Sequence, residues 1–240
     1  MSERLQYQPK LLWLLTLSYV AALLMANWFD IRLIYLGHGL LTDAGTIIFP
    51  LTFLISDLMT EVYGYKQTRR AIWLGFLFNL IFILYGLMVT HLPSPSSDIA
   101  PNNVAFDQMF GFNMLIILAS FVSYLIAEPL NALFLAKLKI RLNGRLMAGR
   151  FLLSTMLGAI LDTSIFSVIA FYYLPMGHLI RFIMTMWVIK VIIEIIGLPL
   201  SIYLAKRLKK YEKLDIYDTG TKFNLFNLNA HYKLSNNHFK

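Results

Sequence analysis

The chain has 240 residues and a net charge of +8, with 58% hydrophobic residues, 14% charged residues and a mean hydropathy of +0.63. Soluble domains carry about 25% charged residues, so this composition excludes an ordinary soluble protein. The chain has no cysteine, which excludes disulfides, thiol catalysis and cysteine-based metal sites.

Long stretches without any charge predict membrane-spanning helices. Residues 11–29 and 71–89 contain no charged side chain, and uncharged apolar runs of about 18 residues are typical of such helices. The first run is longer than the core of a signal peptide, and no small-residue cleavage pattern follows it, so we interpret it as a span. The sequence therefore predicts an all-α membrane protein with six transmembrane helices, at residues 11–29, 45–62, 71–91, 113–136, 151–174 and 182–205.

The segments between these spans alternate in their content of Lys and Arg. Cations gather in residues 1–10, 63–70, 137–150 and after 205, whereas 30–44, 92–112 and 175–181 hold one at most. Cytoplasmic loops carry the excess of Lys and Arg in membrane proteins, so both termini are expected in the cytoplasm. The positive charge is thus explained by topology, and nucleic acid is not an expected partner because no basic stripe alternates with exposed aromatic residues.

The connecting segments differ in character. Residues 30–44 hold several glycines and a stretch at 31–35 that is expected to be extended and to fold back against the membrane. Residues 92–112 are rich in Pro and Ser at their start, which predicts an exposed turn region. We expect a transporter domain over residues 1–206 and a polar cytoplasmic tail over 207–240, of which the Asn-rich part from 211 onward is expected to be poorly packed.

Several ionisable residues lie within the predicted spans. Each costs roughly 2.5–3.5 kcal/mol at bilayer depth, and such residues usually face the protein interior or a water-filled cavity. Asn79 and Asn131 add neutral polar groups at similar depths. The ionisable residues are Asp57, Glu61, Glu128, Asp162, Lys190 and Glu194.

The spacing of these residues leaves alternative interpretations open. Glu61 shares a helical face with Asp57 but sits near the cytoplasmic end, where it is either solvated or paired with Arg69 or Arg70. Lys190 and Glu194 also share a face, so they form a self-neutralising pair, or Lys190 is the counter-charge in a cavity that holds Asp162 or Glu128.

Two further features favour a polar pocket. Pro129 follows Glu128 deep in the fourth span, and a proline there frees a backbone carbonyl and kinks the helix. This kink either relieves packing or, beside Glu128 and Asn131, shapes a pocket. Asp162 lies mid-span with no charged neighbour in sequence, and an isolated aspartate at that depth is a candidate functional residue.

Recognisable enzyme and metal motifs are missing from the sequence. The five histidines lie outside the spans or at their edges, and no zinc-protease, serine-hydrolase or P-loop pattern occurs. We therefore expect neither an enzyme nor a bound metal or cofactor.

Residues 49–65 (FPLTFLISDLMTEVYGY), followed by 69–76 (RRAIWLGF), resemble the signature of the queuosine precursor transporters, which belong to the vitamin uptake transporter group. The resemblance covers residues 10–226. Further matching positions are Ser154, Thr155, Asp162, Thr163, the segment 169–172, Lys190 and the tail segment 217–224 (YDTGTKFN).

This resemblance implies a six-helix importer of the bacterial inner membrane for the 7-deazaguanines preQ0 and preQ1. Its small-molecule substrate and the lipid bilayer are the implied partners, and a homo-oligomer stays open. An alternative is the substrate-binding membrane subunit of an energy-coupled vitamin importer.

We expect the buried polar residues to form the substrate site. Glu128 and Asp162 would accept hydrogen bonds from the base edge or from a cation, Asn131 would orient the ligand, and Lys190 would balance charge. Asp57 would line the cytoplasmic exit or relay protons, and Glu194 completes the set. The fourth span departs from the family pattern, which has Gln and then Asp where this chain has Glu128 and Asn131, so queuine or queuosine also stays open as the cargo.

Overall fold

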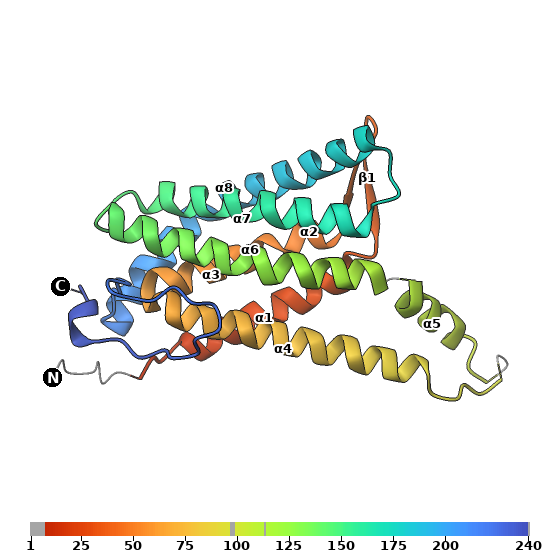
Figure 1. The fold of residues 1–240 in the computed structure, drawn as a ribbon, viewed down its shortest axis with the longest axis horizontal. Coiled ribbons are helices and arrows are strands. Elements are labelled where there is room, and N and C mark those ends of the chain that lie inside the picture. The colour runs from red at the N-terminus through yellow and green to blue at the C-terminus, as the bar shows by residue number, and fades with distance from the viewer. Residues whose placement is uncertain (1–7, 97–98, 113, 240) are drawn as a thin grey trace.

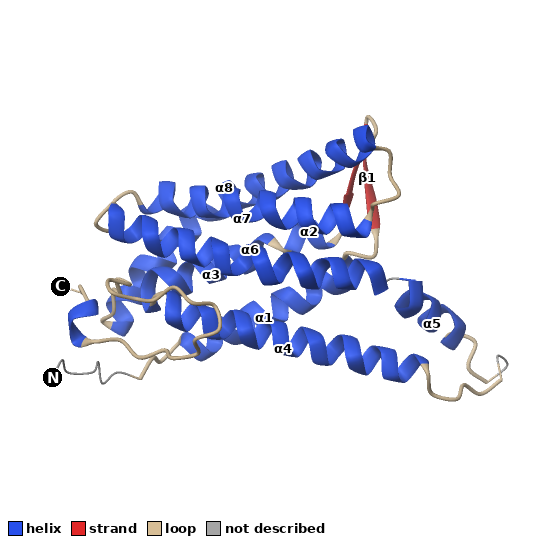
Figure 2. Ribbon diagram, in the orientation of Figure 1, coloured by secondary structure: helices blue, strands red, loops and turns tan. Residues whose placement is uncertain are grey.

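The computed structural model describes residues 8–96, 99–112 and 114–239 as a bundle of long helices with one short β-hairpin (Figures 1 and 2). Six helical segments among the described residues are long and apolar enough to cross a membrane, and this confirms the predicted all-α membrane class. They are Leu12–Phe29 (α1), Gly45–Tyr63 (α2 and α3), Tyr65–Thr90 (α4), Leu115–Arg141 (within α6, Met114–Arg141), Met147–Ala170 (α7) and Met176–Glu212 (α8).

The second span is divided into α2 (Gly45–Ile48) and α3 (Pro50–Tyr63). Pro50 occupies the first position of α3, where its missing N–H group costs no helical hydrogen bond. Gly64 ends α3 with φ +82°, a backbone conformation that favours glycine, and α4 begins at the next residue.

The basic segment expected as a loop at 63–70 is therefore mostly helix. Lys66, Arg69 and Arg70 lie on the first turns of α4. Lys139, expected in the loop 137–150, likewise lies in the last turn of α6. Both α4 and α6 continue beyond their apolar parts. Hydropathy marks the stretch that crosses the hydrocarbon, and a helix does not have to end where the hydrocarbon ends.

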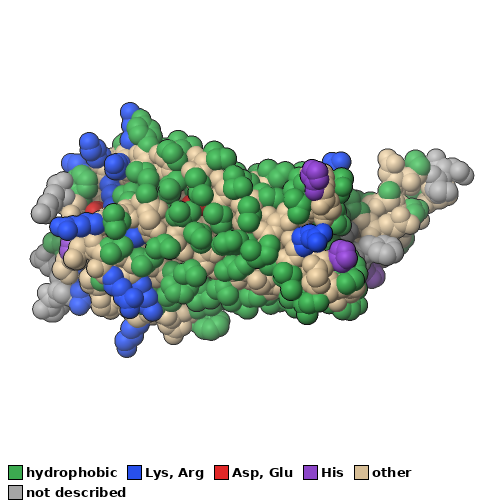
Figure 3. Space-filling model, turned by 90° about the horizontal axis from the view of Figure 1, so that it is seen from above, with side chains coloured by type: hydrophobic (Ala, Val, Ile, Leu, Met, Phe, Trp, Pro, Cys, Tyr) green, Lys and Arg blue, Asp and Glu red, His purple; other side chains and the backbone are tan. Residues whose placement is uncertain are grey.

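α3 lies at the centre of the bundle and packs against α1, α4, α6 and α8. Nearly all its side chains are buried, whereas α1, α4 and α8 expose large apolar residues such as Trp13, Tyr85 and Ile196. Hydrophobic side chains cover the middle of the face that Figure 3 shows. This distribution suits a bundle whose outer surface contacts lipid and whose interior carries the polar groups.

The segment between the first two spans is a two-stranded antiparallel hairpin, β1 (Leu33–Gly37) and β2 (Leu40–Asp43). It returns the chain so that the Ala44 N–H donates to the Arg32 carbonyl at 2.8 Å. The expectation of an extended stretch is therefore confirmed from Leu33 onward, and its folding back against the membrane stays a prediction. β2 packs against α8.

The segment 92–112 contains a helix, α5 (Asn103–Phe112), so its interpretation as a turn region was wrong over that part. The ring of Phe110 fits against Gly86 of α4, where an added Cβ would come within 2.1 Å of the ring, and it lies 5.1 Å from the Trp28 ring. This docking stabilises a helix too short to be stable alone. Sequence periodicity over ten residues does not show such packing.

The C-terminal tail is docked on α4, so the expectation of poor packing was wrong. Side chains of α4 donate hydrogen bonds of 2.6–2.9 Å to backbone carbonyls of the tail: Arg69 to Asn224 and Asn229, Arg70 to Leu228, Trp73 to Leu225 and Lys66 to His231. The tail side chains are polar, but its backbone supplies the acceptors, and composition does not reveal that.

Asp218 anchors the start of this tail. Its carboxylate accepts a hydrogen bond from the Tyr65 N–H at 2.9 Å and from the Tyr232 hydroxyl at 2.6 Å, and it is 3% exposed. The Tyr232 hydroxyl also approaches Gly64 so closely that an added Cβ there would lie 2.4 Å from it. The turn between α3 and α4 and the tail therefore depend on each other.

We predict that Asp218→Ala lowers stability by about 1–3 kcal/mol, because it leaves two buried donors without an acceptor. The melting temperature in detergent should fall by several degrees, and a protease should cut the tail faster than in the wild type. Lys222→Ala is the matched control, because this tail residue is exposed. Equal melting temperatures for both variants would contradict the anchoring role.

Candidate functional site

The two ends of the bundle differ in charge. The start of α1, the α6–α7 connection, the end of α8 and the tail lie together at one end, and Lys and Arg gather there in Figure 3. We call this the basic end. The opposite end, which carries β1 and β2, is the hairpin end.

Four helices bring the six residues expected at the substrate site into one buried group between them. Asp57 comes from α3, Glu128 and Asn131 from α6, Asp162 from α7, and Lys190 and Glu194 from α8. None of the six is more than 3% exposed. We call this group the inner cluster.

Asp57 and Glu128 each have hydrogen-bond donors within the bundle. The Asn131 amide donates to Asp57 Oδ1 at 3.0 Å, and the Thr155 hydroxyl lies 3.5 Å from Asp57 Oδ2. The Thr52 hydroxyl donates to Glu128 Oε1 at 2.9 Å. These contacts join α3, α6 and α7 and fix the two carboxyl groups in place.

Lys190 pairs with Asp162 across α7 and α8, at 2.7 Å between Nζ and Oδ2. The structure therefore supports the interpretation of Lys190 as the counter-charge of Asp162. The alternative, a self-neutralising pair of Lys190 with Glu194, was wrong. The ammonium also lies 4.4 Å from the ring centre of Phe49, a cation–π contact.

Several acceptor atoms of the inner cluster lack a donor among the described residues. They are Glu128 Oε2, Asp162 Oδ1, Asn131 Oδ1 and both carboxylate oxygens of Glu194. Buried polar atoms are hydrogen-bonded in the large majority of cases. A group of fixed acceptors without donors suits a ligand that is rich in N–H groups.

The space at this cluster is narrow. A cavity of about 10 Å³, lined in part by Phe49, Phe166, Asp162 and Lys190, lies on the hairpin side. That is room for about one water molecule. An organic ligand would enter this space only after the surrounding helices separate.

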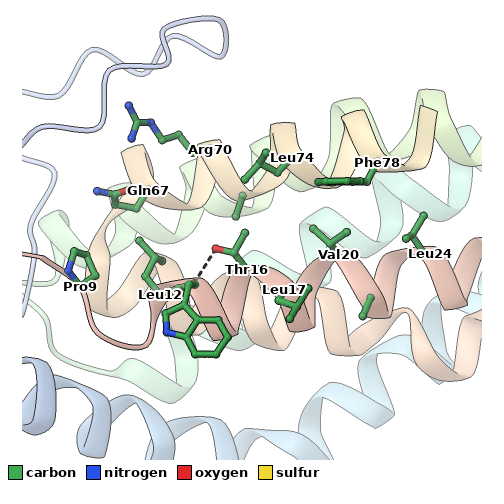
Figure 4. A pocket seen from close by; sticks show the side chains of 13 residues that line it. Pro9, Leu12, Thr16, Leu17, Val20, Leu24, Gln67, Arg70, Leu74 and Phe78 are labelled. Carbon is green, nitrogen blue, oxygen red and sulfur yellow. Dashed lines mark hydrogen bonds between the residues drawn. The ribbon is translucent and has the colours of Figure 1, made fainter. Parts of the chain in front are cut away.

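A much wider groove of about 690 Å³ lies elsewhere, between α1 and α4 (Figure 4). It is apolar, and the hydroxyl of Thr16 within it already donates to the Leu12 carbonyl at 2.8 Å. Exposed side chains such as Trp13 and Leu17 line it, so it belongs to the outer surface of the bundle. A polar ligand finds the acceptors that it needs in the inner cluster and not in this groove.

Glu61 has a different role from the inner cluster. It is fully buried and accepts from Arg150 Nη1 at 2.7 Å and from Lys209 Nζ at 2.6 Å. The expectation that it is solvated, or paired with Arg69 or Arg70, was wrong. Arg69 and Arg70 are engaged by the tail, and the cations of α7 and α8 reach Glu61 instead.

Asp215 of the tail extends this arrangement. It pairs with Lys139 at 2.7 Å and with Lys209 at 2.8 Å, and Lys139 also lies 3.9 Å from Glu61. Together these five side chains link α3, α6, α7, α8 and the tail, and we call them the basic-end network. The network closes the bundle at this end.

Sequence reasoning missed other buried residues next to the inner cluster. Tyr19 donates to the Tyr124 hydroxyl at 2.9 Å, and Tyr124 donates to the Ile72 carbonyl at 2.7 Å. Asp30 and Asp43 are also buried. Both aspartates lie in the segment 30–44, next to the ends of two spans. Counting Asp and Glu in the connecting segments, and not only Lys and Arg, would have drawn attention to them.

Six spans around buried, unsatisfied carboxyl groups define a polytopic membrane transporter. Among the described residues, no group of His, Asp and Glu side chains is placed to hold a metal ion. The sequence profile of the family described as "Putative vitamin uptake transporter" matches residues 43–204, and the chain belongs to this family, whose members are transporters and not enzymes.

A curated relative gives a more specific comparison. The "Probable queuosine precursor transporter" of Bacillus subtilis (strain 168) is 29% identical over 174 residues, which cover 71% of this chain and 74% of that protein. No solved structure matches the chain.

We predict opposite effects of two charge-neutralising substitutions on stability. Glu61→Gln leaves buried cations without their carboxylate and should cost about 3–5 kcal/mol. Glu194→Gln removes a buried charge whose oxygens have no hydrogen-bond partner, so stability should stay equal or increase. Thermal unfolding of both purified variants in detergent distinguishes them, and a larger loss for Glu194→Gln would refute the separation of the two groups.

Proposed function

We propose that this protein imports queuosine precursors, 7-deazaguanine bases such as preQ0 and preQ1, across the bacterial inner membrane as a secondary or facilitative carrier. The supporting observation is the set of buried acceptors without donors in the inner cluster. The name of the Bacillus subtilis relative supports the same cargo.

The chemistry of the cargo complements the inner cluster. A guanine-like edge carries a ring N–H beside an exocyclic amine, and a carboxylate accepts both hydrogen bonds in parallel. Glu128 and Asp162 each keep one oxygen without a donor and suit this role. The aminomethyl cation of preQ1 would interact with a second acid, for which Glu194 is available.

An aromatic face and a positive charge complete the proposed site. Phe49 lies beneath the Lys190 ammonium and lines the narrow cavity, so its ring can stack on a planar base once the helices separate. Asn131 holds Asp57 and keeps its own oxygen free for a ligand donor.

The charge at the two ends supports an orientation. The basic end would face the cytoplasm, because Lys and Arg concentrate on that side of membrane proteins. The cargo would enter from the hairpin end, and its release would require the basic-end network to separate. Closure at one end while the other opens is the general requirement for a carrier.

A growth experiment tests the cargo. The full chain is expressed in a queuosine-deficient bacterium that lacks its own transporter, and preQ0, preQ1 or queuine is supplied at low concentration. We expect tRNA queuosine to return with at least one of them. If it returns with none although the protein is present in the membrane, the proposed function is wrong.

The site assignment leads to a separate prediction. Glu128→Gln and Asp162→Asn should each lower uptake about tenfold or more, because a charge-assisted hydrogen bond contributes about 1.5–3 kcal/mol. Uptake is normalised to the amount of protein in the membrane. Asp107→Asn on α5 is the control and should transport like the wild type; equal uptake by all three variants would remove the assignment.

A further inference from the structure

Two buried aspartates face each other at the hairpin end, outside the six spans. Asp30 directly follows α1, and Asp43 ends β2. They are 6% and 0% exposed, and both lie against the first residues of α2. Asp30 also packs on Gly45, where an added Cβ would lie 1.8 Å from its Oδ1, so the glycine is required for this arrangement.

Polar and charged side chains from four helices surround the two aspartates. Ser120 of α6 donates to Asp30 Oδ2 at 3.0 Å, and the N–H and hydroxyl of Thr46 in α2 donate to Asp43 Oδ1 at 2.6 and 2.9 Å. Lys190 of α8 acts electrostatically on both aspartates, and its ammonium is bonded to Asp162 of α7. Three acids therefore share one lysine among the described residues of this region.

Two neighbouring carboxyl groups that are both buried cannot both stay ionised without strong repulsion, so one of them binds a proton. Thr46 supplies two donors to Asp43 Oδ1 and stabilises the ionised form of this side chain, while Asp43 Oδ2 lacks a donor among the described residues. Burial raises the pKa of Asp30 well above its usual range, and the charge of Asp43 raises it further. The proton of the pair therefore resides on Asp30.

We propose that the Asp30–Asp43 pair is a proton-binding site that couples cargo import to proton entry. This inference rests on the proposed function and adds its driving force. When the hairpin end opens, the Asp30 carboxylate takes one proton from external water and becomes a neutral carboxyl group. When the basic end opens, the same proton leaves to the cytoplasm by way of the small cavity that Asp30 and Asp162 both line, and the carboxylate returns.

Lys190 links this site to the inner cluster. While Asp30 is neutral, Asp43 and Asp162 are the two negative charges near Lys190. The Lys190 ammonium then stays bonded to Asp162, with 2.7 Å between Nζ and Oδ2. Loss of the proton leaves a second carboxylate beside Asp43 and draws the ammonium toward the aspartate pair. Asp162 then loses its counter-charge, so protonation at the hairpin end and cargo binding at Asp162 affect each other.

A purely structural role for the two aspartates makes a different prediction. Asp43 also caps the start of α2 through Thr46, and an asparagine oxygen accepts the same hydrogen bonds. Asp30→Asn and Asp43→Asn therefore keep the shape and the cap while they remove the exchangeable proton. If the aspartates only support the fold, these variants transport as the wild type does.

The main experiment uses the purified full-length chain in liposomes, with radiolabelled preQ1 as cargo and a pH-sensitive dye inside. For the wild type we expect internal acidification that depends on cargo, and at least tenfold accumulation when the outside is acidic. Exchange of labelled for unlabelled preQ1 without a pH gradient measures transport alone. We expect Asp30→Asn and Asp43→Asn to keep exchange but lose accumulation and acidification, whereas the control Asp107→Asn keeps all three.

Each other outcome overturns the inference. Wild-type exchange without cargo-dependent acidification leaves the proposed function intact and removes proton coupling. Accumulation by Asp30→Asn at the wild-type level, or loss of exchange in both variants, removes the assignment to this pair.

A second measurement does not depend on the cargo, and it remains valid if no deazaguanine is transported. The folded chain holds a proton on Asp30 that an unfolded chain releases near pH 4, so wild-type stability should fall as the pH rises above about 4. The melting temperature of Asp30→Asn should fall less steeply over the same range. Identical slopes would overturn proton binding at this site, whatever the cargo.

Discussion

The cost of burying charge in a low-dielectric interior governs the arrangement of this protein. A carboxylate that leaves water must find cations and hydrogen-bond donors, or remain protonated, or leave the site open to a ligand. The chain uses these solutions in different places. At the basic end, Lys139, Arg150 and Lys209 surround Glu61 and Asp215, so the cations outnumber the acids. In the inner cluster the balance is reversed, because four acids face only Lys190 among the described residues.

This contrast separates the acids of the basic-end network from those of the proposed substrate site better than burial does. Glu61 and Glu194 are both fully buried glutamates. Glu61 accepts from two cations, whereas neither oxygen of Glu194 has a hydrogen-bond partner among the described residues. An acid whose partners are all present contributes to the fold, and an acid whose partners are missing is available for binding. The number of donors around each acid is therefore the informative quantity.

The sequence was sufficient for the six spans and for the residues of the inner cluster, because both depend on local properties. An uncharged apolar stretch identifies a span, and an isolated charge within it identifies a costly side chain that must face inward. The partners of these charges could not be predicted in the same way. Arg150 lies 89 residues from Glu61, and the choice between it and the nearby Arg69 depends on which helices pack together. The docked tail escaped prediction for a related reason, since its backbone carbonyls and not its side chains make the contacts with α4.

The docking of the tail also has a consequence for biosynthesis. Residues 224–231 leave the ribosome long after α4, so Arg69 and Arg70 have no tail carbonyls to bind while the first spans enter the membrane. In the proposed orientation, their charges are free during that interval to hold the start of α4 on the cytoplasmic side, as cationic flanks do during insertion. Once translation reaches the tail, the same guanidinium groups become its hydrogen-bond donors. In that orientation, the two arginines would serve first in orienting the nascent chain and later in completing the folded one.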